Sequence, residues 1–317
     1  MKDAMENKVV YKGMKRLRYS DRAEEIKDAV HSPYKLWRDY LRLSKDYWWV
    51  CKQKGDTLDA ELKSMYEDFG DVYELGFNDW WWQKGGVLFA EQVKLPVVKQ
   101  INDNLTNLSP NPQNHLLVEI PLNLTERTIS RQLMKIIRAH KGRKIERVSH
   151  AKRPLAKLVG IRKRVLRRAH DIWCLNHLVK LAKQESSAIG APFNKLTTHQ
   201  MGVGFRLVPN CMPKKWDGAE TGRKKRNGMK VAVSRMITRA DALIANAEIG
   251  KFPSFDKVEP RKRWTEKQQK EFDLALANNE WMPPDIDIDD FRKMFEKLPT
   301  LPKGYRLDID GLYVESF

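Results

Sequence analysis

The sequence predicts a mainly α-helical protein with a minor α+β character. It is expected to have several helices, one short internal strand and a C-terminal β-hairpin. Apolar residues recur at helical spacing in most segments, and helix caps and glycine stops bracket these segments. Strand-like alternation is confined to residues 116–122 and 305–315. Hydrophobic residues make up 41% of the 317-residue chain, which is enough for a packed core.

The N-terminal part is expected to hold aromatic-rich helices. Ser32-Pro33 is typical of a helix start, and Gly70 and Gly85-Gly86 are typical of helix ends. Three consecutive tryptophans cannot share one helix face, so one of them is expected to pack in a core and another to be free for a partner. The predicted helices span residues 33–55, 58–69 and 78–85.

Later elements alternate with loops. A strand is predicted to precede an amphipathic helix that starts near Thr125 and stops at Gly142, with Asn123 and Glu126 at capping-box spacing. A C-terminal hairpin is predicted to turn at Asp310-Gly311. The predicted ranges are a strand over 116–122, a basic helix over 155–184, a loop over 190–227, a helix over 229–249 and a short helix over 290–298.

The length suits two domains, or one large domain with appendages. The Pro- and Asn-rich residues 109–114 form the clearest linker by composition. The aromatic helices are expected to build a core of their own or a surface for a protein partner or for self-association. The predicted parts are a basic arm (1–19), an aromatic-rich helical domain (20–108), a basic nucleic-acid-binding region (115–250) and an acidic C-terminal region with the hairpin (251–317).

Positive charge is concentrated in the middle third of the chain. Residues 138–239 contain 26 Lys and Arg against five acids, a local charge of +21, whereas the whole chain carries +18. Charge confined in this way favours a polyanionic partner, and nucleic acid is the commonest one, because each neutralised phosphate releases condensed counterions. The sequence therefore predicts a nucleic-acid-binding protein, with DNA favoured over RNA.

The basic helix is the first candidate for phosphate contact. Its cations stack at i, i+4, whereas the residues spaced to face a core are Val165, Leu166, Ala169, Ile172 and Trp173. Stacked like charges repel each other, and a bound phosphate backbone would reverse the sign of that effect. A solvated charged face is the alternative. The predicted contact residues are Arg162, Lys163, Arg164, Arg167 and Arg168.

The segment 124–136 (Leu-Thr-Glu-Arg-Thr-Ile-Ser-Arg-Gln-Leu-Met-Lys-Ile) resembles the recognition-helix segment of bacterial helix-turn-helix regulators. The resemblance implies that short polar and forked donors on its early turns meet base edges and phosphates. A plain amphipathic helix packed on its strand is the alternative. The residues expected to contact nucleic acid here are Arg127, Thr128 and Arg131, followed by Arg143 and Lys144.

A run of four cations bracketed by glycines, Arg223, Lys224, Lys225 and Arg226, predicts a basic loop that follows a phosphate backbone. A targeting patch or a tip without a partner is the alternative. Trp216 lies just upstream of this run. It is a candidate for stacking on a base, or else a packing lid.

Metal and cofactor chemistry find little support in the sequence. His170, Cys174 and His177 share one helix face and are weak metal candidates, with ordinary core packing as the alternative. Residues 285–296 place carboxylates at calcium-loop spacing but lack the required glycine. No phosphate loop or hydrolase elbow is present, so no cofactor is expected, and catalysis is uncertain, with non-enzymatic function favoured.

The sequence thus predicts a protein that binds nucleic acid, double-stranded DNA first, as a regulator or a replication or packaging factor. Three alternatives remain open: an RNA-binding protein, a metal-dependent nuclease using scattered acids such as Asp68, Asp71, Glu74 and Asp79, and a basic docking protein for an acidic partner. The N-terminus lacks a secretory pattern and no long apolar run occurs, so a cytoplasmic location without a membrane partner is expected, nucleoid-associated if bacterial.

Overall fold

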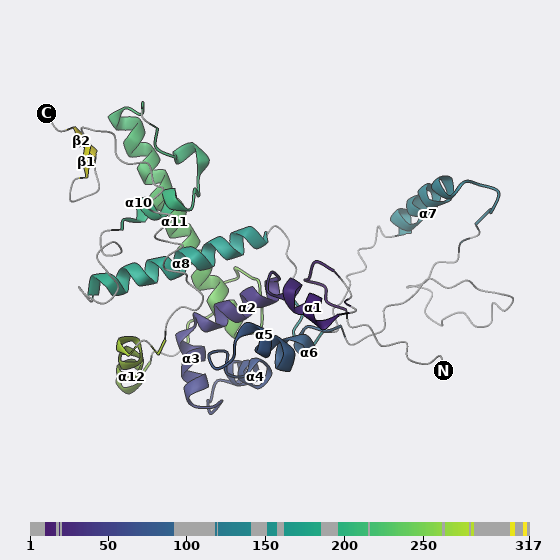
Figure 1. Ribbon diagram of the computed structural model, residues 1–317, viewed down its shortest axis with the longest axis horizontal. Coiled ribbons are helices and arrows are strands. Elements are labelled where there is room, and N and C mark those ends of the chain that lie inside the picture. The colour runs from purple at the N-terminus through teal and green to yellow at the C-terminus, as the bar shows by residue number, and fades with distance from the viewer. Residues whose placement is uncertain are drawn as a thin grey trace. The chain divides into compact units, whose positions relative to one another are not determined.

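A computed structural model gives the fold of the chain (Figure 1), and the mainly α-helical class is confirmed. The chain divides into two compact units, one formed by residues 1–90 with 151–317 and the other by residues 91–150. The structure describes residues 10–16, 19, 21–91, 118, 120–140, 151–156, 162–184, 196–214, 216–261, 264–278, 280–281, 305–307 and 313–315.

The first unit begins with short helices that polar side chains cap. Ser44 divides the predicted helix over 33–55 in two, because its hydroxyl accepts a hydrogen bond from the backbone N–H of Tyr47 (2.8 Å) and starts a new helix. Asp59 caps the next helix, which ends before Gly70 as predicted. These helices are α1 (Arg22–Ala29), α2 (Pro33–Arg42), α3 (Lys45–Lys52) and α4 (Ala60–Phe69).

The tryptophan-rich segment is a continuous run of helical turns. It comprises α5 (Phe77–Trp80), a π-helical turn (Trp81–Gly85) and α6 (Gly86–Leu88), so the predicted stop at the glycine pair is wrong. A Cβ atom at Gly85 would lie 2.7 Å from the Trp81 ring and 2.8 Å from the Trp80 ring, so this glycine allows close ring packing. Trp80 and Trp81 are buried, whereas Trp82 is 58% exposed.

The described residues in the second half of this unit include three long or medium helices and one short helix. These are α8 (Lys163–Gln184), α10 (Thr198–Gly204), α11 (Ala219–Glu248) and α12 (Glu266–Ala277), with a 3₁₀ turn at Pro209–Cys211. Helices α10 and α12 were not predicted, although capping boxes at Thr197/Gln200 and Thr265/Gln268 are present in the sequence at their starts. It also placed the start of α11 ten residues too late, at 229 instead of 219.

The aromatic helices do not form a core of their own. Trp37 of α2 is fully buried and packs against Phe69, Phe89 and Phe252, with ring centroids 5.4 to 5.8 Å apart. Its indole N–H donates to the carbonyl oxygen of Ala247 in α11 (3.3 Å). Leu166 and Ala169 of α8 belong to the same buried cluster. Residues of the basic region thus complete the core of the N-terminal helices. The domain boundaries given by the sequence remain a prediction.

A second buried cluster joins α8, α10 and α11, and α11 crosses α8 in Figure 1. Gly202 of α10 lies directly against α11, since a Cβ atom there would be 2.3 Å from Cγ of Met229. The absence of a side chain therefore lets the two helices approach closely. The cluster contains Ile172, Leu175, Val179, Leu196, Met201 and Val233.

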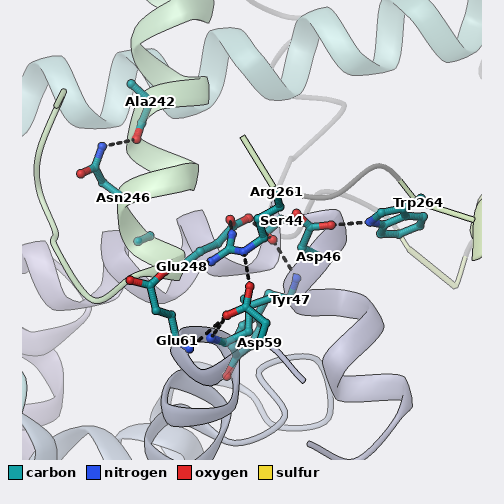
Figure 2. Close-up of polar contacts among 12 residues, drawn as sticks. Ser44, Asp46, Tyr47, Asp59, Glu61, Ala242, Asn246, Glu248, Arg261 and Trp264 are labelled. Atoms are coloured by element: carbon teal, nitrogen blue, oxygen red, sulfur yellow. Dashed lines mark hydrogen bonds and ion pairs between the residues drawn. The ribbon is translucent and has the colours of Figure 1, made fainter. Parts of the chain in front are cut away.

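A buried ion-pair network ties the segment after α11 to the N-terminal helices (Figure 2). The Arg261 guanidinium binds the carboxylates of Glu248 in α11 and Asp59 at the start of α4, the latter at 2.7 Å. The Ser44 hydroxyl donates to Glu248, and the Trp264 indole donates to Asp46. Burial raises the pKa of the Glu248 carboxyl to about 7, although Arg261 beside it acts in the opposite direction.

Several predicted elements fall on residues that the structure does not describe. These are the helix over 290–298, the calcium-like loop over 285–296, part of the strand over 116–122 and the turn at 308–312. Two short strands, β1 (Tyr305–Leu307) and β2 (Tyr313–Glu315), pair in antiparallel register with Tyr305 opposite Glu315. Because the connecting turn is not described, the hairpin itself remains a prediction.

Candidate functional site

Cations from two separate segments meet in an open groove of about 740 Å³. One wall is the first two turns of α8, and the other is the chain that follows α10. Among the residues that the structure describes, Asp171 is the only acid that lines the groove. The lining residues are Lys163, Arg164, Arg167, Arg168, Asp171, Gly204, Phe205, Arg206 and Pro209.

The amphipathic pattern of α8 orients its cations. Leu166, Ala169 and Ile172 are fully buried, as predicted, whereas Val165 and Trp173 are only partly buried. This face turns Arg164 and Arg167 toward solvent. Burial and the neighbouring like charges both disfavour the protonated forms of two groove cations. Partial burial together with Arg167 lowers the pKa of Lys163, and partial burial together with Arg164 lowers the pKa of Arg168. The groove therefore holds positive charge at a cost that an anion would relieve.

Asp171 offsets only part of this positive charge, because its carboxylate also contacts a neighbouring side chain. Its Oδ1 lies 3.2 Å from Nδ1 of the buried His170. The carboxylate is thus shared between the groove and this histidine, and five cationic side chains face a single acid.

Arg206 is the groove residue that sequence analysis missed. It follows α10 with φ +48°, in the left-handed region that favours glycine. Backbone hydrogen bonds close the turn, from Arg206 N–H to Val203 O (2.9 Å) and from Leu207 N–H to Gly202 O (3.1 Å). Leu207 packs against the second buried cluster, which holds the strained turn in place. A lone arginine in a predicted loop gave no local signal for this role.

The run Arg223–Arg226 is not a loop, and this prediction is wrong. It occupies the early turns of α11, because all four side chains are good helix formers. Gly228 allows close approach, since a Cβ atom there would lie 2.8 Å from the Cys211 sulfur. Lys225 pairs with Asp217, and Lys224 pairs with Glu220 at 2.7 Å. None of the four lines the groove described above.

The helix predicted from the helix-turn-helix resemblance is present as α7 (Glu126–His140), in the second unit. Arg127 and Arg131 are exposed one turn apart, and Thr128 is partly buried with its hydroxyl 2.9 Å from that of Thr125. Residues 118 and 120–125, the described part of the chain just upstream, are not helical. Arg143 and Lys144 lie outside the described residues. The role of this helix in recognition remains a prediction.

His170, Cys174 and His177 do not converge on one point. His170 lies 3.9 Å from the Cys174 sulfur, but His177 stacks on Trp173 and contacts the edge of Trp281. The acid Asp68 is paired with Lys152 and Arg153. Among the described residues, no three His, Cys, Asp or Glu side chains are arranged to hold a metal ion.

Comparison with known proteins adds no assignment: no family model, no curated protein and no solved structure matches this chain. Within the part of the chain that the structure describes, no helix combines the length and apolar character needed to span a lipid bilayer.

The buried His199 of α10 makes the stability of the fold depend on pH. Burial, followed by the charges of Arg226 and Lys230, lowers its pKa to about 4. Below pH 6.5 the imidazole is protonated in the unfolded state but stays neutral in the folded state until about pH 4. The contribution of His199 to the free energy of unfolding is therefore fully present above pH 6.5 and is lost as the pH falls toward 4. We expect about 1 to 2 kcal/mol of this loss between pH 7 and pH 5.

Urea unfolding at both pH values measures this loss, and His199→Gln is expected to remove it. The exposed His31→Gln serves as the matched control. Identical pH dependence in the wild type and in His199→Gln would contradict the prediction.

Proposed function

We propose that this protein binds nucleic acid, double-stranded DNA in the first place, by holding backbone phosphates in the groove between α8 and the chain after α10. The observation that carries the proposal is a convergence of five cations from two separate segments, with one acid beside them among the described residues. These cations are Lys163, Arg164, Arg167, Arg168 and Arg206. A charged face that only contacts solvent would not require cations from two segments to meet. Nor would it require an arginine in the left-handed backbone conformation, as Arg206 is.

The chemistry of these side chains suits phosphate. Four of the five cations are arginines, whose planar guanidinium groups donate pairs of hydrogen bonds to phosphate oxygens. The groove is open, which suits a long polymer better than a small enclosed ligand. Contacts of this kind position a nucleic acid without selecting a sequence, so in this proposal any base recognition comes from elsewhere, with α7 as the candidate.

Other exposed arginines are further candidates because of their positive charge. The exposed Arg127 and Arg131 on α7 and the exposed Arg223 on α11 are further candidates for phosphate contact. Duplex RNA presents the same phosphates, so RNA binding is the nearest alternative. A role as a regulator or as a replication or packaging factor at the bacterial nucleoid or elsewhere in the cytoplasm belongs to the same proposal.

Fluorescence anisotropy with a labelled DNA duplex, repeated from about 50 to 300 mM salt, tests the proposal. If each of the five groove cations neutralises one phosphate, the log–log salt slope is expected to be about −4 to −5. Weak binding with a flat slope would overturn it and would point to an acidic protein partner. Duplex RNA and a divalent-metal cleavage assay serve as parallel arms for the RNA-binding and nuclease alternatives.

A further inference from the structure

Trp216 is the most exposed of the ten tryptophans in the chain. Its side chain is 79% exposed, compared with 58% for Trp82, the other exposed one. An indole is a large apolar group, and leaving it in water forfeits the stabilisation that burial would bring. The structure thus excludes a packing lid at this position and leaves a solvent-facing aromatic surface.

The described residues on either side of Trp216 make defined polar contacts. The Asp217 carboxylate accepts a hydrogen bond from the Lys214 backbone N–H (2.8 Å), and both its oxygens bind the Lys225 ammonium group (2.6 and 2.8 Å). Lys225 also reaches the carbonyl oxygen of Met212 (3.4 Å). The Asp217 and Lys225 side chains are only 12% and 16% exposed, so this brace is largely shielded from water. These contacts hold Asp217, the neighbour of Trp216, against Lys225 of α11, while the indole points into solvent.

A cation contacts Trp216 directly, since the Lys214 ammonium group lies 5.6 Å from the centroid of the Trp216 ring. The exposed Arg223 follows on the first turns of α11, the next helix along the chain. An aromatic face among phosphate-binding cations is the combination that single-stranded nucleic acids require, with the base on the ring and the backbone on the charges. An apolar protein surface would gain nothing from these cations, and it would have to desolvate them.

We propose that Trp216 is a stacking platform for an unpaired base, so that the substrate class includes single-stranded nucleic acid. This inference rests on the proposed function. Contacts between the groove cations and phosphates alone would not distinguish single-stranded from double-stranded nucleic acid. Bases inside a duplex are already stacked on each other, so an indole at the surface reaches only a base that is unpaired or displaced. Trp216 thus adds a preference that the groove cannot supply.

The test compares three labelled probes: an oligothymidylate of about 20 nucleotides, the same backbone with abasic sites, and a duplex of equal length. Trp216→Ala is expected to weaken binding to the oligothymidylate by roughly 5- to 100-fold, and to change binding to the abasic strand and the duplex by less than about twofold. Trp216→Phe keeps an aromatic ring and is expected to retain part of the affinity. Trp82→Ala is the matched control, since it removes another exposed indole.

The possible outcomes separate this inference from the proposed function. If the wild-type protein binds none of the three probes, the proposed function fails and the inference fails with it. If the wild type binds and Trp216→Ala leaves every affinity unchanged, the inference alone is overturned. An equal loss on all three probes would also overturn it, because it would assign Trp216 a structural role.

Discussion

Replacing Arg164, Arg167 and Arg206 together by alanine is expected to weaken duplex DNA binding roughly 100- to 1000-fold at about 100 mM salt. The log–log salt slope is expected to become less steep by about 3. The physical reason is that three of the five groove cations then release no counterions. Anisotropy titrations at several salt concentrations measure both quantities on one set of samples.

The matched control removes the same charge from other faces of the first unit. Lys27 on α1, Lys63 on α4 and Lys267 on α12 are all exposed, and their joint replacement by alanine lowers the net charge equally. A similar loss of affinity in the control would mean that overall charge, and not the groove, drives binding. That result would contradict the assignment of the site.

Arg206→Gly offers a second safeguard. Glycine adopts the left-handed backbone at this position without the steric cost that arginine carries, so the fold is expected to be as stable or slightly more stable. The guanidinium group is nevertheless lost from the groove. Weaker DNA binding in a protein that unfolds at the same or higher urea concentration therefore cannot result from misfolding.

Replacing Arg261 by methionine is expected to destabilise the protein by about 3 to 5 kcal/mol. Methionine fills similar space but leaves Glu248, only 7% exposed, without its cation and removes the ion pair with Asp59 (Figure 2). The penalty is expected to be larger at pH 8 than at pH 5. The Glu248 carboxyl, whose pKa is already raised to about 7 by burial, accepts a proton at the lower pH and then needs no partner.

Urea unfolding at both pH values measures this effect. Arg16→Ala is the control, because the Arg16–Glu24 pair is about half exposed and such pairs contribute about 0 to 1 kcal/mol. Arg261→Met combined with Glu248→Leu is expected to recover part of the loss, since no buried charge then remains unpaired. A destabilisation by Arg261→Met no larger than that of the control would contradict the prediction.

Local signals in the sequence predicted much of the secondary structure. Ser32-Pro33 and Gly70 mark helix boundaries that the structure contains, and the apolar spacing of Leu166, Ala169 and Ile172 correctly gave the buried face of α8. The two capping boxes at Thr197 and Thr265 were equally readable, and they were missed. These features depend on residues within one or two turns of each other, which is why sequence alone determines them.

The helical class and the concentration of positive charge follow from the sequence, because spacing and composition are properties of the chain. Which cations meet depends on the packing of the folded chain. Arg206 joins the groove because Leu207 packs into a core that α8, α10 and α11 build together. Likewise, Trp216 faces water because Lys225, on the next helix, holds Asp217. Such positions depend on packing between segments distant in sequence, which no local pattern encodes.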